Sequence, residues 1–242
     1  MRIPRFYTNQ ALQPDTEVIL EATLSHYICT VLRLKEGSPI VLFNGDGSDF
    51  PSQITIIHKK HCSALVDAQI SLHVESPLSV HLAQGVSKGD RMDYALQKAV
   101  ELGVSEITPV ITEFCNVKLS EDRWAKKHEQ WLKIIIGACE QSQRNRLPIL
   151  HQPVPYSRFI GKQSNMKKLI LAPSSQHYLS GIARSETGFQ LLIGPEGGFS
   201  EQEVYTAEQI GYTAVNMGPR ILRTETAAVT SIAVLQALHG DL

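Results

Sequence analysis

The sequence predicts two structural units, a small β domain over residues 1–75 and an α/β domain over residues 76–242. Short β-branched runs separated by turn residues fill the first part of the chain. From Ser79 on, continuous apolar runs alternate instead with segments of helical periodicity. Such alternation is typical of a parallel sheet that is covered by helices on both faces. The segment around Pro77 is expected to join the two units.

The composition excludes several classes of protein. With 242 residues, 43% hydrophobic and 19% charged, the chain is an ordinary globular sequence. The net charge of −1 gives no overall field toward a nucleic acid or a membrane surface. The four cysteines lie far apart without C-x-x-C spacing, which favours reduced thiols over a disulfide framework. No segment resembles a membrane span or a signal peptide, so we predict a soluble cytoplasmic protein with no membrane partner.

The first 75 residues are expected to be all-β. Residues 40–50 contain an apolar run, a Gly-Asp-Gly turn and a return strand, which is the pattern of a β-hairpin. Two further β-branched runs within residues 54–70 flank a polar turn that contains His58, His61 and Cys62. These three residues could form a metal cluster, but no second cluster accompanies them, so we interpret them as a hairpin turn and predict no metal site.

The second unit is expected to contain five strands and four helices. The predicted strands cover residues 79–86, 106–111, 168–172, 189–193 and 213–217. The predicted helices cover residues 90–103, 120–141, 200–210 and 224–239. Apolar residues at helical spacing mark the buried faces of the first two helices, namely Met92, Leu96, Ala99, Val100, Trp124, Trp131, Ile135 and Ala138. Gly103 is expected to cap the carboxyl end of the first helix.

Three segments follow predicted strands at the edge where parallel sheets bind ligands, namely 172–174, 193–198 and 217–227. The glycine-rich segment 193–198 lacks the Lys-Ser or Lys-Thr of a phosphate-binding P-loop, and Pro195 removes one backbone N–H from it. Ser200 and Glu203 then form a capping box, which satisfies the donors of the following helix. The residues alone leave a ligand loop and a plain tight turn open as interpretations.

The segment 217–227 is more informative. Thr224 is a plausible N-cap of the last helix, and Glu225 suits the first turn of a helix dipole. Arg223 has no such explanation, because a cation at the positive end of a helix is unfavourable unless it serves an anionic partner. We therefore predict a functional role for Arg223.

Six segments, taken in order, resemble a known family. They are RIPRFY from Arg2, LRLKEG from Leu32, KGDRMDYALQKAVELGV from Lys88, ACEQSQRNRLP from Ala138, LLIGPEGGFS from Leu191 and GPRILRTETA from Gly218. Together they resemble the ribosomal small-subunit RNA uridine-N3 methyltransferases, the RsmE family of the SPOUT class. One departure is the segment TEFCNVKL, where the family would place an arginine near Phe114 or Cys115 and this chain offers Lys118 instead.

The resemblance implies both a fold and an activity. The fold is a SPOUT-type α/β domain with a parallel sheet and a deep trefoil knot, preceded by a small PUA-like β-barrel that helps to hold RNA. The activity is transfer of a methyl group from S-adenosylmethionine to N3 of a specific uridine in 16S ribosomal RNA of the small subunit, by a homodimer. A non-catalytic ribosome assembly factor of the same fold is the alternative. A nucleotide-dependent oxidoreductase is disfavoured, because the glycine fingerprint of such enzymes is absent.

The resemblance also assigns residues to roles. The residues implied in cofactor binding are Leu171, Ala172, Ile193, Gly194, Pro195, Glu196, Gly197, Gly198, Met217, Gly218, Ile221, Leu222, Arg223, Thr224, Thr226 and Ala227. We expect Arg223 to stabilise the deprotonated uridine, and Glu196 or water to accept its proton. The residues expected to contact RNA are Arg2, Arg5, Lys88, Arg91 and Arg144.

Overall fold

The computed structural model describes residues 3–58 and 61–242, and the chain forms two compact units. The first unit contains the described residues up to Glu75 together with Cys139–Leu147. The second contains Ser76–Ala138 and Pro148–Leu242. The units therefore differ from the predicted domains in one respect, because the residues that follow Ala138 as far as Leu147 group with the first unit.

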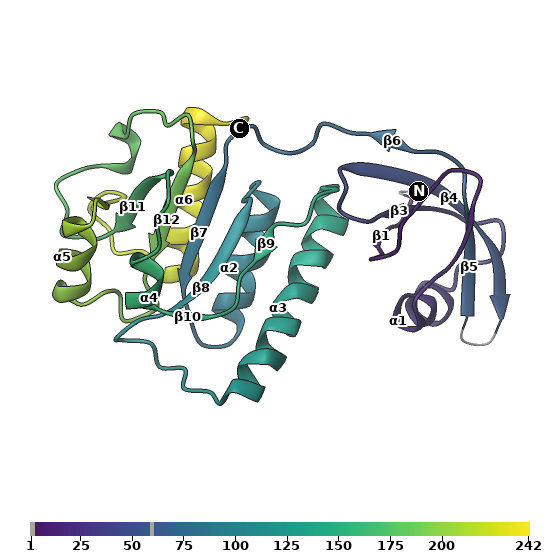
Figure 1. The fold of residues 1–242 in the computed structure, drawn as a ribbon, viewed down its shortest axis with the longest axis horizontal. Helices are drawn as coiled ribbons and strands as arrows, with labels where there is room; N and C mark the ends of the chain where they lie inside the picture. Colours follow the sequence, from purple (N-terminus) through teal and green to yellow (C-terminus); the bar gives the residue numbers. More distant parts are fainter. Residues whose placement is uncertain (1–2, 59–60) are drawn as a thin grey trace. The chain divides into compact units, whose positions relative to one another are not determined.

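The first unit is built on a six-stranded sheet (Figure 1). The strands are β1 (Arg5–Tyr7), β2 (Glu17–Ile19), β3 (Pro39–Phe43), β4 (Ser48–His58), β5 (His61–Val66) and β6 (Ile70–Ser71). They pair in the order β1-β3-β4-β5-β2, with β6 against β4, and β1 alone runs parallel to its neighbour. The core beneath them consists of Phe6, Leu12, Val18, Leu20, Ile28, Ile40, Leu42, Phe50, Ile54, Cys62, Ala64 and Val66.

The predicted hairpin at residues 40–50 is confirmed. Leu42 in β3 pairs with Phe50 in β4, and both side chains are buried. In the turn, the Asn44 Oδ1 atom accepts a hydrogen bond from the Asp46 backbone N–H at 3.2 Å. Gly45 and Gly47 have φ of 91° and 99°, which explains glycine at both positions.

The expectation that the first 75 residues are all-β was wrong in one place. A short helix, α1 (Ala22–His26), continues into one turn of π-helix at Tyr27–Val31. Leu24 and Ile28, four residues apart, both pack into the core of this unit. The β-branched residues around this segment favour a strand prediction. Strand propensity is only a weak guide, however, because tertiary packing determines the conformation of such a segment.

Two arginines that were expected to contact RNA are structural parts of the first unit. Arg5 is 9% exposed, and its Nη2 atom lies 2.5 Å from Asp49 Oδ1. Arg144 is 6% exposed, and its Nε and Nη2 atoms donate to Glu75 Oε2 at 2.9 and 2.6 Å. A phosphate could reach either guanidinium only by breaking a buried ion pair. We therefore leave both residues out of the proposed RNA contacts.

The second unit is a parallel sheet, as predicted (Figure 1). Its strands are β7 (Val80–Gly85), β8 (Glu106–Ile111), β9 (Ile149–Leu150), β10 (Val154–Pro155), β11 (Lys167–Leu171), β12 (Phe189–Ile193) and β13 (Thr213–Val215). They pair in the order β10-β8-β7-β12-β11-β13, with β9 also against β8. The near-continuous burial of β7, β8 and β12 follows from their position inside the sheet.

Helices cover both faces of this sheet. The helices of the unit are α2 (Asp90–Glu101), α3 (Glu121–Ser142, whose last residues from Cys139 on belong to the first unit), α4 (Tyr156–Ile160), η2 (Leu179–Gly181), α5 (Glu201–Gln209) and α6 (Thr224–His239). On one face α6, yellow in Figure 1, packs against α2, β7 and β12. On the other face, α4 and α5 share an apolar cluster with strand residues such as Ala83, Ile170 and Leu192.

All five strands and all four helices predicted for this unit are present, with shifts of one or two residues at some ends. Of the predicted core residues only Trp124 is not fully buried. Gly103 has φ of 84° at the end of α2, as expected of a helix cap. No pattern predicts β9, β10, α4 or η2, which have two to five residues each and, unlike the similarly short β11, β12 and β13, are not marked by a longer apolar run.

Replacing Arg5 by alanine should loosen the first unit, because it leaves the buried Asp49 carboxylate without its partner, at a cost of about 3–5 kcal/mol. Hydrogen exchange measured by mass spectrometry should accelerate in peptides from β3 and β4. The exposed Lys35→Ala variant is the control and should leave exchange unchanged. If Arg5→Ala left hydrogen exchange unchanged but weakened RNA binding, Arg5 would be an RNA contact and not a structural residue.

Candidate functional site

The main cavity of the second unit lies where the carboxyl ends of β11 and β12 meet the amino end of α6. Its volume is about 550 Å³, within the range of small-molecule sites. It is lined by Arg91, Leu171, Pro173, Ile193, Gly194, Pro195, Glu196, Gly197, Gly198, Phe199, Ile221, Leu222, Arg223, Thr224, Glu225 and Ala227. The three segments that the sequence places beyond strand ends all contribute residues to this one cavity.

The glycine-rich loop 193–198 is held by close backbone contacts. A Cβ atom on Gly85, at the end of β7, would lie 2.4 Å from the backbone nitrogen of Pro195. A Cβ on Gly197 would lie 2.7 Å from the Cβ of Phe114. Gly198 has φ of 72°, and its N–H donates to the Pro195 carbonyl at 2.9 Å. The loop is therefore a tight turn whose glycines permit close approach on both sides, and it also forms a wall of the cavity.

Thr224 connects this loop to the neighbouring strand. Its hydroxyl donates to the Gly194 carbonyl at 2.6 Å and accepts from Gln84 Nε2 at 2.9 Å. The expectation that Thr224 is an N-cap was wrong, since the N-cap of α6 is Arg223 and Thr224 is the first helical residue. The hydroxyl instead joins the ends of β7 and β12 beside the cavity.

Glu196 fastens the glycine-rich loop to the start of α2. Its Oε1 atom accepts from the Lys88 backbone N–H at 3.0 Å and from Arg91 Nη1 at 2.9 Å. Partial burial raises the pKa of Glu196, but hydrogen bonds from the Lys88 and Glu196 backbone and from Arg91 outweigh it, so the pKa is lowered overall. The carboxylate is therefore ionised at neutral pH and is a weak base.

The predicted capping box of α5 is confirmed. Ser200 Oγ accepts from the Glu203 N–H at 3.2 Å, and Glu203 Oε2 accepts from the Ser200 N–H at 3.0 Å. The other oxygen of Glu203 accepts from the Glu113 N–H at 2.9 Å. The box thus also anchors the segment that carries Phe114, which rests on Gly197.

Two charged residues at the amino end of α6 line the cavity. Arg223 is exposed at the N-cap and makes no ion pair with any residue in the described part of the chain. The Oε2 atom of Glu225 is buried and has no hydrogen-bond partner among the described residues. A cationic ligand group would satisfy the Glu225 oxygen, and an anionic one would suit Arg223.

Most of the residues implied in cofactor binding line the cavity, but four do not. Ala172 is buried in the core, and Met217, Gly218 and Thr226 lie outside the lining. The sequence did not assign Pro173, Phe199 or Glu225 to the cofactor, and it assigned Arg91 to RNA. Pro173 and Glu225 lie within the segments 172–174 and 217–227, which were selected because they follow predicted strands. Their position in these segments was the signal that could have assigned them to the site.

A second, basic cavity opens beside Lys88. Its volume is about 320 Å³, and its lining combines four cationic residues, Lys88, Arg123, Lys126 and Lys127, with apolar Val86, Val117 and Leu119. The sequence had indicated only Lys88 here, because the charges of α3 read as an ordinary solvated helix face. Arg2 lies outside the described residues. Lys118, the expected substitute for a family arginine, is exposed, and its role stays a prediction.

No helix in the described ranges 3–58 and 61–242 has both the length and the apolar character needed to cross a membrane.

Comparisons with known proteins agree on one family. A family model described as an RNA methyltransferase domain matches residues 74–236, and one described as an RNA methyltransferase PUA domain matches residues 20–67. Ribosomal RNA small subunit methyltransferase E of Buchnera aphidicola (subsp. Schizaphis graminum) is 36% identical over 100% of this chain and 98% of its own length. The protein of the same name from Bacillus subtilis is 34% identical over 97% and 96%.

Solved structures agree as well. A methyltransferase from Legionella pneumophila, in complex with bound S-adenosylmethionine, superposes with a TM-score of 0.96 at 42% identity, covering 100% of both chains. Ribosomal RNA small subunit methyltransferase E from Neisseria gonorrhoeae, bound to S-adenosylmethionine, gives 0.93 at 38% identity, again over 100% of both chains.

Replacing Gly85 by alanine should destabilise the second unit, because the new methyl group would displace the Pro195 backbone by about an ångström. We expect a cost of about 1–3 kcal/mol and a melting temperature lower by several degrees in calorimetry. The control is Gly137→Ala in α3, where nothing lies within 4 Å of an added Cβ. Equal melting temperatures for the two variants would show that the contact at Gly85 is not tight.

Proposed function

Because the chain belongs to the ribosomal RNA small subunit methyltransferase E family, we propose that it transfers a methyl group from S-adenosylmethionine to N3 of a uridine in 16S ribosomal RNA of the small subunit. The observation that carries this proposal is the 550 Å³ cavity, whose walls are the glycine-rich loop and the segment before α6. Both segments belong to the motifs that define the resemblance.

The residues of the cavity fit S-adenosylmethionine. Leu171, Ile193 and Leu222 offer apolar surface to an adenine ring. The buried Oε2 atom of Glu225 offers an acceptor to the ammonium or sulfonium charge. The cofactor has no phosphate, which agrees with a loop that contains a proline and precedes a self-capped helix. When bound, it supplies an electrophilic methyl group that needs alignment rather than activation.

We assign Arg223 the role of stabilising the substrate anion. N3 of uridine is a weak acid and must lose its proton before it can attack, which leaves negative charge on the ring nitrogen and oxygens. Arg223 lines the cavity, is exposed, and stands at the amino end of α6, where the helix dipole adds to its positive charge. A fixed cation at this place lowers the energy of the anion.

Glu196 is better suited to positioning than to accepting the proton. Its oxygen already accepts two hydrogen bonds, and its lowered pKa makes it a weak base. Between the two acceptors expected from the sequence, we therefore favour water. Glu196 instead holds the glycine-rich loop against α2, which keeps the cavity in shape.

The basic cavity is our candidate for the RNA contact of the second unit. Lys88, Arg123, Lys126 and Lys127 surround an apolar floor, an arrangement that suits phosphates around an unstacked base. Lys88 connects the two cavities, because its backbone N–H donates to Glu196. Arg91 lines the cofactor cavity and stays a candidate at its rim.

The remaining expectations are also proposals. We propose a homodimer that acts in the cytoplasm, where ribosomal RNA is found. Ile221, at the rim of the cofactor cavity, is 86% exposed, and such a large apolar side chain at a site supports its being covered by a second copy. The trefoil knot that the resemblance implies stays a prediction.

A non-catalytic assembly factor of the same fold is the alternative function. Such a protein would bind RNA through the basic cavity but would have no use for the cofactor. Titration of the protein with S-adenosylmethionine in a calorimeter separates the two, because binding is expected of the enzyme alone.

Replacing Arg223 by alanine should spare cofactor binding and remove catalysis. We expect the calorimetric dissociation constant for S-adenosylmethionine to change by less than about threefold, while methyl transfer to small-subunit RNA falls by about 100-fold or more. The residual rate should increase with pH further into the alkaline range, because the uridine must then ionise without help. Arg220→Ala, an exposed neighbour, is the control. Unchanged turnover in Arg223→Ala would contradict the assigned role.

Reversing the charge of both Lys126 and Lys127 to glutamate should weaken RNA binding by about tenfold or more and reduce its salt dependence. Affinity for S-adenosylmethionine should not change. The matched control is the double reversal of Arg158 and Arg184, which are exposed elsewhere in the same unit. Equal loss in both double variants would indicate a general charge effect instead of a site.

A further inference from the structure

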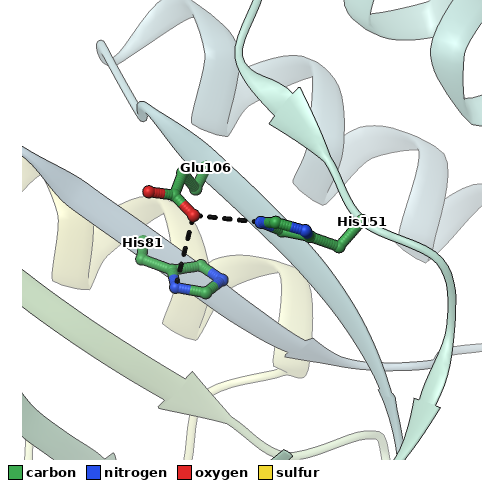
Figure 2. Close-up of side chains that lie close together, drawn as sticks. All are labelled: His81, Glu106 and His151. Atoms are coloured by element: carbon green, nitrogen blue, oxygen red, sulfur yellow. Dashed lines mark hydrogen bonds and ion pairs between the residues drawn. The ribbon is translucent and has the colours of Figure 1, made fainter. Parts of the chain in front are cut away.

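A second cluster of polar side chains lies at the end of the sheet opposite to the cofactor cavity, near the amino ends of β7 and β8. His81 lies near the start of β7, Glu106 begins β8, and His151 directly follows β9. Figure 2 shows the three side chains pointing toward one another. His81 and Glu106 pair across the amino ends of β7 and β8, and the two-residue β9 pairs with the start of β8, which places His151 beside them. The residues that line the cofactor cavity lie beyond the carboxyl ends of β11 and β12.

The three side chains present ligand atoms of the right kind in a small space. His151 Nε2 lies 3.0 Å from Glu106 Oε2, and His81 Nδ1 lies 3.9 Å from the same oxygen. One ligand atom from each residue lies within 4.8 Å of the other two. A tetrahedral ion with bonds of about 2.0–2.1 Å separates its ligand atoms by roughly 3.4 Å, so shifts of about an ångström would close the set around one ion.

The surroundings of His81 orient its ring for this role. His81 Nε2 lies 2.8 Å from Thr108 Oγ1, and donation to that hydroxyl leaves the lone pair on Nδ1, the nitrogen nearer Glu106. Gln190 Nε2 is 3.4 Å from Nδ1, a long contact, and Gln190 is itself held by the Tyr212 hydroxyl at 2.9 Å.

The cluster also faces a space that could hold a further ligand. A cavity of about 270 Å³ is lined by all three residues together with Ser164 and Asn165. Lys162 lines it as well, and its charge would oppose a cation, but this lysine is exposed and its ammonium group can remain in water. Two imidazoles and one carboxylate with an open position form the donor set that borderline divalent metals prefer.

We propose that His81, Glu106 and His151 bind one divalent transition-metal ion such as Zn²⁺, with water as the remaining ligand. The ion joins β7 and β8 to the residue that follows β9. β9 has only two residues and pairs only with β8 among the described strands, so a metal link would hold this part of the sheet. The site is structural, and it is independent of the proposed methyl transfer.

The test titrates the full-length, metal-free protein with zinc chloride by calorimetry and with cobalt chloride by absorbance. One ion should bind per chain, and the cobalt spectrum should show ligand-field bands of nitrogen and oxygen ligation without thiolate charge transfer. His151→Gln, at a half-buried position, and Glu106→Gln should each weaken zinc binding by about tenfold or more. The matched control is His177→Gln, an exposed histidine outside the cluster.

A thermal scan gives a readout that does not depend on spectra. Zinc at 100 times its dissociation constant should raise the melting temperature by roughly 5 °C in the protein and in His177→Gln, but not in His151→Gln. Affinity for S-adenosylmethionine should be equal in all variants, which separates this proposal from the proposed function. The absence of stoichiometric binding, thiolate bands in the cobalt spectrum, or equal zinc affinity in His151→Gln and His177→Gln would each overturn it.

Discussion

The close contact between the backbones of two strand ends is the constraint on which the functional part of this protein depends. Gly85 ends β7, and the absence of a side chain there lets Pro195 and Gly194 lie directly against it. The Thr224 hydroxyl then links Gly194 to Gln84, which brings the start of α6 to the same point. This contact holds the glycine-rich loop and the start of α6, two of the three segments that line the cofactor cavity, against the end of β7.

The polar groups around the cavity are of two kinds. Some are hydrogen-bonded within the protein and hold the loops in place, and others have no partner among the described residues and could contact a ligand. Glu196 Oε1, the Thr224 hydroxyl and both carboxylate oxygens of Glu203 are hydrogen-bonded to other parts of the protein, and these bonds fix the loops. Arg223 and Glu225 line the cavity. Arg223 makes no ion pair with a described residue, and the buried Oε2 atom of Glu225 has no hydrogen-bond partner among them. This division explains why Glu196 is a poor candidate for a base, although it stands in the middle of the loop that the sequence singles out.

The sequence predicted the fold well where elements are long. Periodicity located every strand and helix of the second unit that exceeds five residues, and the glycine-rich loop and the segment before α6 were recognised as one site by their place after strands. Features that depend on tertiary contacts could not be predicted from the sequence. Arg5 and Arg144, which the sequence indicates as RNA contacts, hold buried ion pairs that only the tertiary structure reveals. His81 and Glu106 lie in two strands and His151 follows a third, with no regular spacing in the sequence, so this cluster could be found only from the pairing of the strands.

Mass spectrometry of small-subunit ribosomal RNA tests the central claim most directly. RNA that lacks the modification would be incubated with the protein and S-adenosylmethionine, and the products would be digested and compared with those of a reaction without protein. The proposal predicts one added methyl group on one uridine, at N3. A protein that binds the cofactor but adds no methyl group, or that methylates another base or another position of the ring, would contradict it.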